Sequence, residues 1–332
     1  MDNKTNLKQS INLHWLRPDN ALWAYGFSRT FGAICREKTC NMSTLDLGCG
    51  DGTTSFLMLG GEFKIGFDAF HAIQVGEESL EPDTIRSSTG SLRDEKGDFY
   101  NVYDDKWKTN ILNNILKRPP TKYTYGSDWK ESLVKKANDL DLYNELSDLD
   151  SNIYPWIYDS NSIDFIFSTI IYWLNNPNDV LKEVNRVLSK DGIFAFSAPK
   201  TNITSHTLIN QMKDFEYPNL SVYDRGRHAN WERHSKDFKH WENLINENNF
   251  EIVDYKEFHP TLQIAFGETI NRTLLSAYNI LYKKLLKTDR DTFFEFKEEY
   301  CSKIYDLVEP FLDDEYYENV EKAYHAFFIK KK

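Results

Sequence analysis

Short apolar runs alternate along the chain with segments in which apolar residues recur at helical spacing. Over residues 19–36, apolar side chains return every three or four positions, and Asp19 or Asn20 stands where a helix cap is expected. Continuous apolar runs of strand length follow further along the chain, and they predict strands at 44–47, 122–128, 162–168 and 193–199.

Helices are predicted between these strands. One begins at Thr53, directly after a glycine turn, and ends at Gly60. Another follows residue 128, and a third has Asn176 as its cap, Pro177 in its first turn and Gly192 at its end. Strands that alternate with helices and are apolar almost throughout indicate a parallel sheet covered on both faces, so the fold class is α/β.

The rest of the pattern is less regular. Residues 69–121 are mostly polar and predict an insertion without regular structure, preceded by an extended segment at 63–68. Further strands are expected at 250–255 and 323–330. Between them, helical patterns at 270–286 and 293–312 predict a helical cap over the sheet.

Composition and charge narrow the class of protein. The 332 residues are 40% hydrophobic and 15% aromatic, which is typical of a globular chain. The formal net charge of -11 argues against a nucleic acid or an anionic membrane as partner. Four scattered cysteines and a start without an apolar core favour a cytoplasmic location. No metal site is evident in the residue spacing.

The run "LDLGCGDG" carries the clearest chemical signal, since it places a tight turn directly behind a buried strand. Gly48, Gly50 and Gly52 allow the backbone to approach a ligand closely. A dinucleotide-binding turn would have a third glycine where Thr53 stands, and Asp46 would repel a pyrophosphate. The turn therefore favours a ligand with a cationic end.

The same run resembles motif I of the class I methyltransferases that use S-adenosylmethionine, of the type 11-like group. The resemblance covers roughly Ser43 to Pro199 and implies a Rossmann-like sheet, mostly parallel, with its last strand antiparallel. It implies that Gly48, Cys49, Gly50, Asp51 and Gly52 wrap the methionine part of S-adenosylmethionine. The acid at Asp46 is then expected to place the amino group.

The family also has an acid at the end of the second strand that binds the ribose. Asp68 and Asp128 both match this position; Asp128 is favoured because Trp129 and a helix follow it, although it could also cap that helix. "DSNIYPW" is similar to the family's adenine-binding segment, which implicates Asp150 and Ser151. Ser168 follows the fourth strand and joins the expected cofactor residues.

Acceptor-binding residues are expected in a later segment, 223–241, on the carboxyl side of the sheet. Arg225 and Arg227 could clamp an anion, and His228 or His234 could act as the base. Two earlier residues, Arg17 and Tyr172, are also expected to contact the substrate. The chain resembles methyltransferases of surface-polysaccharide and small-molecule gene clusters, which suggests a small anionic or sugar-like acceptor such as a nucleotide-linked sugar or a glycan.

The predicted organisation has three parts: a helical lid at 1–42, a cofactor-binding core at 43–268 and 323–332, and the helical cap at 269–322. Two other functions are weighed against methyl transfer. One is a non-catalytic protein that binds the cofactor for regulation, and the other is an NAD-dependent oxidoreductase. The methylated atom, the need for a base and the oligomeric state stay open.

Overall fold

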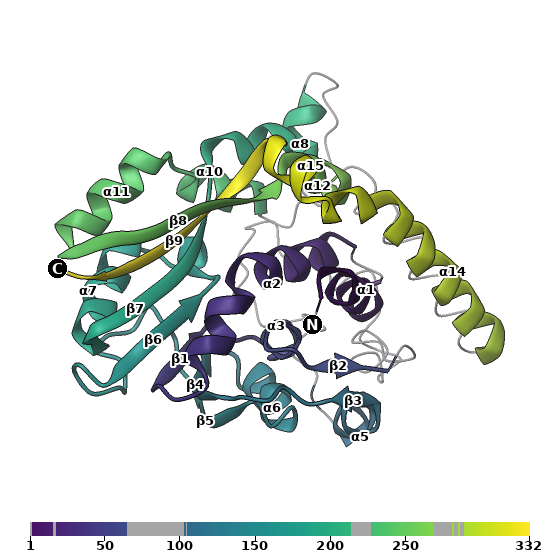
Figure 1. Cartoon of the computed structure of the whole chain (residues 1–332), viewed down its shortest axis with the longest axis horizontal. Helices are drawn as coiled ribbons and strands as arrows, with labels where there is room; N and C mark the ends of the chain where they lie inside the picture. Colours follow the sequence, from purple (N-terminus) through teal and green to yellow (C-terminus); the bar gives the residue numbers. More distant parts are fainter. Residues whose placement is uncertain are drawn as a thin grey trace.

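A seven-stranded sheet forms the centre of the molecule (Figure 1). The computed structural model describes residues 2–15, 18–64, 103, 105–213, 227–268, 281, 285 and 289–332. The strands lie in the order β5-β4-β1-β6-β7-β9-β8. Their bounds are β1 Thr44–Leu47, β4 Tyr123–Asp128, β5 Tyr143–Asp148, β6 Ile163–Ser168, β7 Leu188–Pro199, β8 Phe250–Pro260 and β9 Lys322–Lys331.

Strand orientation confirms the predicted fold. β1 runs parallel to β4 and β6, and the β4–β5 and β6–β7 pairs are also parallel. β9 alone runs antiparallel to its neighbours β7 and β8. This is the Rossmann-like sheet of class I methyltransferases, with its last strand antiparallel. β5 lies at the edge and has half-exposed positions, so its weak apolar pattern did not predict it.

Helices cover both faces of the sheet, because successive strand residues point to opposite sides. In β6, Phe167 packs in a core with residues of α2 and α3, whereas Ile166 packs in a second core with residues of α7 and α11. The helices are α1 Asn3–Leu13, α2 Pro18–Lys38, α3 Thr53–Met58, α5 Asp105–Asn114, α6 Glu131–Asp139, α7 Pro177–Val187, α8 Leu208–Gln211, α10 Arg227–His234, α11 Phe238–Glu247, α12 Thr261–Phe266, α14 Arg290–Val308 and α15 Asp314–Asn319.

Two helix boundaries test the sequence reasoning. Asn176 caps α7 as predicted, since its side chain accepts a hydrogen bond from the amide of Asn178. The prediction that Gly192 ends this helix is wrong, because Gly192 lies inside β7. Leu188 already pairs with Ile163 of β6, and a register shift lets the following residues remain in the strand. Pairing with β6 therefore ends the helix at Val187, earlier than the glycine would.

The insertion is more ordered than expected. Its residues 105–117 form α5 and the strand β3 (Ile115–Lys117), so the prediction of no regular structure is wrong for them. β3 pairs with β2 (Glu62–Phe63) in a separate two-stranded sheet. The expected extended segment at 63–68 therefore begins outside the main sheet, and its residues 65–68 lie outside the described residues.

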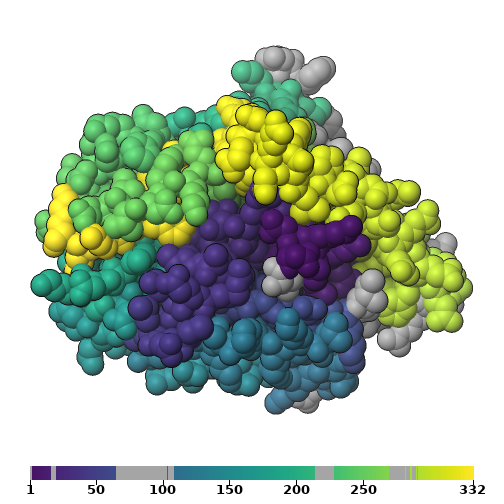
Figure 2. All heavy atoms as spheres, viewed as in Figure 1, coloured from purple at the N-terminus to yellow at the C-terminus, as the bar shows by residue number. Residues whose placement is uncertain are grey.

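The N-terminal and C-terminal helices pack on each other. Leu7 and Ile11 of α1 and Leu22 of α2 share a buried cluster with Ile304 and Val308 of α14. In Figure 1, α14 runs beside α1 and extends away from the sheet. Figure 2 shows the N-terminal residues, in purple, held between the α5–α6 region and the C-terminal helices in yellow. No helix in the described part of the chain has the length and apolarity needed to cross a bilayer.

Candidate functional site

The glycine turn lies at the carboxyl end of β1, where ligands bind in open α/β sheets. Gly48, Gly50 and Gly52 have φ angles of +81°, +59° and +78°. The amides of Gly48 and Cys49 both donate to the carbonyl of Ser127, each at 2.8 Å. A Cβ on Gly48 would lie 2.4 Å from the side chain of Ile170, whereas a Cβ on Gly50 would meet nothing within 4 Å. The turn is closed at Gly48 and open at Gly50.

Asp46 lies beneath this turn and is 2% exposed. Its Oδ2 accepts hydrogen bonds from the hydroxyls of Ser55 at 2.6 Å and Tyr143 at 2.7 Å. Burial raises the pKa of Asp46 to about 6, and the nearby Asp128 carboxylate adds to the rise. A buried carboxylate of this kind favours a cationic ligand group. Tyr143 was not predicted as a site residue. The signal in the sequence was Gly126, because a glycine inside a strand often marks a place where another group approaches closely.

Asp128 connects the end of β4 to the turn. Its Oδ2 accepts a hydrogen bond from the amide of Gly50 at 3.1 Å, and its Oδ1 accepts one from the amide of Lys130 at 3.0 Å. Burial raises the pKa of its carboxyl group. β4 is the neighbour of β1, so Asp128 ends the strand beside the turn, and its role in ribose binding stays a prediction. Trp129 follows it, and its ring centroid is 5.1 Å from the ammonium of Lys130. The competing Asp68 lies outside the described residues.

Two other residues of the turn have local roles. Oδ1 of Asp51 accepts hydrogen bonds from the amide of Thr53 at 3.0 Å and from its hydroxyl at 2.6 Å, which stabilises the start of α3. Cys49 is a buried residue with 9% of its surface exposed, and burial raises the pKa of its thiol well above the usual range. Cys49 is therefore not a reactive thiolate in this site.

The remaining expected cofactor residues also follow or end strands of the sheet, at their carboxyl ends. Asp150 follows β5, and its Oδ1 accepts two hydrogen bonds from Asn152, at 2.9 Å from the amide and 2.8 Å from the side chain. Ser151 beside it is 4% exposed. Ser168 ends β6 and donates to the carbonyl of Leu47 at 2.9 Å. The structure thus brings the ends of β1, β4, β5 and β6 together.

Both candidate catalytic histidines belong to α10, which contacts the 3-10 helices η4 (Ile171–Trp173) and η5 (Thr201–His206) beyond the ends of β6 and β7. His228 bonds through Nδ1 to the hydroxyl of Thr207 at 2.9 Å and through Nε2 to the carboxylate of Glu232 at 3.2 Å. Burial, with the nearby charges of Arg233 and Lys236, lowers the pKa of His234 to about 4. His234 is therefore neutral at pH 7.

The structure leaves several predicted residues untested. Arg17, Asp68 and Arg225 lie outside the described residues, and so does the side chain of Arg227. Their roles in binding stay predictions.

Aromatic residues from distant segments meet near these histidines. Trp231 of α10 donates from its indole nitrogen to the hydroxyl of Tyr324 at 2.7 Å. The ring of Tyr324 lies 4.5 Å from that of Trp23 and 6.0 Å from that of Tyr172. His259, at the end of β8, lies 4.1 Å from Trp23, and burial lowers its pKa to about 3. We call these five residues the aromatic cluster. Apart from Tyr172, the sequence reasoning did not single them out as site residues.

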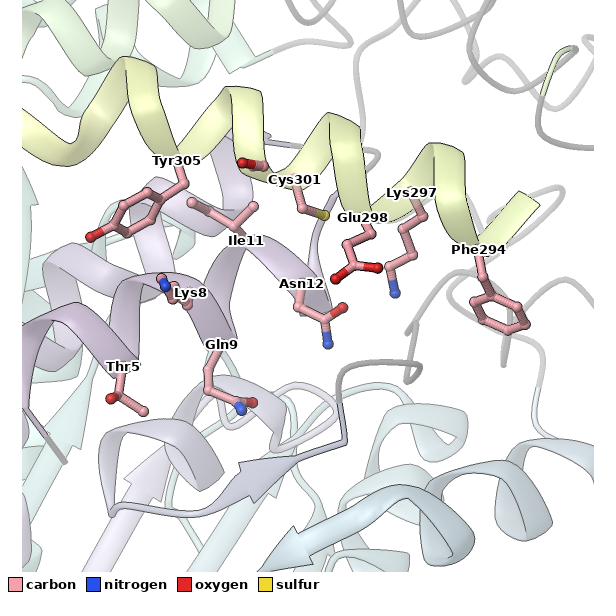
Figure 3. Close-up of a pocket in the computed structure, with 11 residues that line it drawn as sticks. Thr5, Lys8, Gln9, Ile11, Asn12, Phe294, Lys297, Glu298, Cys301 and Tyr305 are labelled. Atoms are coloured by element: carbon pink, nitrogen blue, oxygen red, sulfur yellow. The ribbon is translucent and has the colours of Figure 1, made fainter. Parts of the chain in front are cut away.

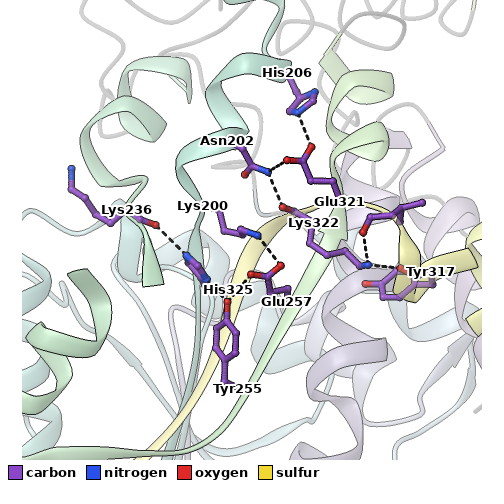
Figure 4. Close-up of polar contacts among 11 residues, drawn as sticks. Lys200, Asn202, His206, Lys236, Tyr255, Glu257, Tyr317, Glu321, Lys322 and His325 are labelled. Carbon is purple, nitrogen blue, oxygen red and sulfur yellow. Dashed lines mark hydrogen bonds and ion pairs between the residues drawn. The ribbon is translucent and has the colours of Figure 1, made fainter. Parts of the chain in front are cut away.

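A polar network extends along β8 and β9 on the other face (Figure 4). Lys200 forms an ion pair with Glu257 at 2.7 Å, and the hydroxyl of Tyr255 bonds to both Glu257 and Nδ1 of His325. Nε2 of His325 bonds to the carbonyl of Lys236 at 3.1 Å. These contacts hold the chain between α10 and α11 against the sheet, which fixes the position of α10.

A cavity of about 480 Å³ lies between α1 and α14 (Figure 3). Its lining includes Lys8 and Asn12 from α1 and Lys297, Glu298 and Cys301 from α14. None of its lining residues is a predicted site residue. Within the described ranges, no three His, Cys, Asp or Glu side chains gather closely enough to bind a metal ion.

A family model matches part of the chain. Residues 110–196 match a family model described as a methyltransferase domain, so the match starts after the glycine turn and includes Asp128, Asp150 and Ser168. No curated protein sequence matches the chain.

Solved structures are similar to the chain at low sequence identity and with TM-scores below 0.5. A methyltransferase from Geobacter sulfurreducens, in complex with S-adenosylhomocysteine, is 12% identical with a TM-score of 0.43; the match covers 92% of this chain and 90% of that one. A methyltransferase from Mesorhizobium loti is 11% identical with a TM-score of 0.41, over 89% and 93% of the two chains. One from Thiobacillus denitrificans, also with S-adenosylhomocysteine, is 10% identical with a TM-score of 0.40, over 92% and 90%.

Proposed function

We propose that this chain is an S-adenosylmethionine-dependent methyltransferase that transfers a methyl group to an oxygen or nitrogen of a small acceptor. One observation carries the proposal: an open glycine turn at the end of β1 has a buried carboxylate, Asp46, beneath it and a second carboxylate, Asp128, bonded to Gly50. The match to a methyltransferase domain, which begins at residue 110 within the insertion, supports the same conclusion.

The residues present fit the cofactor. The open space at Gly50 allows close approach of the methionine part, and Asp46 offers a buried carboxylate to its ammonium. In this proposal Asp128 binds the ribose hydroxyls, and Asp150, which follows β5, binds the adenine. S-adenosylmethionine supplies a methyl group on a positively charged sulfur. The chain's task is to align the acceptor and, for a hydroxyl, to accept its proton.

A small anionic or sugar-like acceptor is the second part of the proposal. Its support is the sequence at the start of α10, where Arg225 and Arg227 precede His228. His234 is neutral at pH 7, but its lowered pKa makes it a weak base, so His228 is the stronger candidate for accepting a proton. Once an acceptor is identified, replacing both arginines by alanine is expected to raise its KM with little change in S-adenosylhomocysteine binding. Unchanged acceptor KM in that variant would exclude the anion clamp.

Calorimetry tests the cofactor directly. The wild-type protein is expected to bind S-adenosylhomocysteine, and the ligand is expected to raise the thermal midpoint. NAD serves as the contrasting ligand, because an oxidoreductase of similar fold would bind it instead. Binding of NAD without binding of S-adenosylhomocysteine would overturn the proposal.

The two ribose candidates can be separated by a matched pair of variants. Asp128→Asn removes the charge and one of the two acceptor oxygens that hold Gly50 and Lys130. It is expected to weaken S-adenosylhomocysteine binding about 10-fold or more. Asp68→Asn is expected to leave the affinity unchanged within about twofold. The reverse result would assign the ribose to Asp68.

A further inference from the structure

Tyr143 fits into a slot made by two glycines. It is the first residue of β5, and its ring lies over Gly126 of β4, where a Cβ would be 2.6 Å from its Cδ1. A Cβ on Gly52 would lie 3.3 Å from Cε2 of the same ring. A glycine inside a strand often marks a place where another group approaches closely. The space that Gly126 and Gly52 leave is the space that the phenol ring fills.

This slot directs the hydroxyl of Tyr143 to Asp46. The hydroxyl donates to Oδ2 at 2.7 Å, and both residues are buried, with 7% and 2% of their surface exposed. The hydroxyl of Ser55 donates to the same oxygen at 2.6 Å. Two donors on one oxygen fix the orientation of the carboxylate and leave Oδ1 for another donor. In the described part of the chain, no Lys, Arg or His forms an ion pair with Asp46.

We propose that Tyr143 is a positioning residue for S-adenosylmethionine: its hydroxyl holds the carboxylate of Asp46 so that the free oxygen meets the ammonium of the methionine part. The inference rests on the proposed function and adds to it a residue from β5, outside the glycine motif. It also assigns Gly126 a purpose, since any side chain there would displace the tyrosine ring.

The groups that face Asp46 support a cationic ligand. They come from several elements, and each is neutral or acidic: Cys35 of α2, Cys49 of the turn, Tyr123 and Asp128 of β4, Ser55 of α3 and Tyr143 of β5. Without a cation, the ionised carboxylate is stabilised by its two hydroxyl donors alone. Loss of one donor should therefore weaken the binding of ligands that carry an ammonium.

The test compares two ligands on the variant Tyr143→Phe. S-adenosylhomocysteine carries the ammonium, whereas 5′-methylthioadenosine keeps the nucleoside and lacks the amino acid part. By calorimetry, the variant is expected to bind S-adenosylhomocysteine about 10-fold more weakly and 5′-methylthioadenosine equally well within about twofold. The acid limb of S-adenosylhomocysteine binding should also move to higher pH, because the phenol stabilises the ionised carboxylate. A purely structural defect would weaken both ligands alike.

Matched controls keep the result interpretable. The ring centroid of Tyr123 lies 5.8 Å from that of Tyr143, and the hydroxyl of Tyr123 does not bond to Asp46. Tyr123→Phe should therefore change the affinities for the two ligands by the same factor. Ser55→Ala should separate them as Tyr143→Phe does. Equal loss for both ligands, or no loss for either, in a Tyr143→Phe protein with native near-ultraviolet circular dichroism would overturn the inference alone. A wild-type protein that binds neither ligand would overturn the proposed function.

Discussion

The site at the glycine turn and the aromatic cluster are built in different ways. At the turn, Asp46, Ser55 and the glycines between them come from one run of ten residues, and β4 adds Asp128. In the aromatic cluster, Trp23, Tyr172 and Tyr324 come from α2, η4 and β9, which are far apart in sequence. A local motif is enough to build the first site, whereas the second exists only when several distant segments have folded together.

The largest expected effect comes from tightening the closed end of the glycine turn. Gly48→Ala places a Cβ 2.4 Å from Ile170 at a φ of +81°. Strain and overpacking should lower the free energy of unfolding by about 2–5 kcal/mol. Urea denaturation measures this directly.

Gly50→Ala is the matched control, because its Cβ would meet nothing within 4 Å and only the φ of +59° is unfavourable. Its cost should be about 1 kcal/mol of stability. The same variant should still weaken S-adenosylhomocysteine binding, since the added methyl enters the open space. Equal destabilisation by both substitutions would show that the turn is not closed at one end and open at the other.

The raised pKa of Asp46 predicts how the stability of the ligand-free protein changes with pH. The pKa of Asp46 is raised from 3.8 to about 6, so the folded protein holds this proton more tightly than the unfolded chain does. Ionisation of Asp46 therefore destabilises the ligand-free fold as pH rises from about 4 to 6, by about 3 kcal/mol in total. Asp46→Asn cannot ionise, so its stability relative to wild type should increase over that pH range.

This advantage should disappear when ligand is present. At pH 7, S-adenosylhomocysteine should stabilise the wild type more than Asp46→Asn, because only the wild type offers a carboxylate to the ammonium. A stability difference between the two proteins that does not change from pH 4 to 7 would exclude the raised pKa.

The smallest effect is expected in the aromatic cluster. Trp231→Phe removes the hydrogen bond to the hydroxyl of Tyr324 and should lower the free energy of unfolding by about 1 kcal/mol. S-adenosylhomocysteine affinity should not change, because Tyr324, the partner of Trp231, belongs to the aromatic cluster and not to the glycine turn. Weaker S-adenosylhomocysteine binding in this variant would mean that the aromatic cluster and the glycine turn are coupled.

Much of the fold was predictable from the sequence because local signals agreed with it. The strand at 44–47 and the cap at Asn176 were confirmed where the pattern predicted them. β5 was not predicted because it is an edge strand whose exposed positions weaken the apolar pattern. The predicted helix end at Gly192 was wrong because the chain already pairs with β6 from Leu188 onward. Within the predicted helical lid, the bounds of α1 were not predicted, since this helix is mostly polar and is stabilised by α2 and α14.

For the site, the glycine turn and the acids Asp46 and Asp128 beside it were predictable from the sequence, but the side chain of Tyr143 that bonds to Asp46 was not. Tyr143 contacts Asp46 across 97 positions of sequence, and no spacing rule connects such a pair. His259 was overlooked for a similar reason: it matters only once α2 and β9 surround it. Residues that act through tertiary contacts become visible only when the fold is known.

The position of β9 has a consequence for synthesis of the chain. In the part of the chain that the structure describes, β8 pairs with the sheet only through β9, yet β9 follows it by some sixty residues. A growing polypeptide therefore exposes β8 and the free edge of β7 until the last strand has left the ribosome. Unpaired edges of this kind promote aggregation, so we expect the nascent protein to depend on protection during this interval.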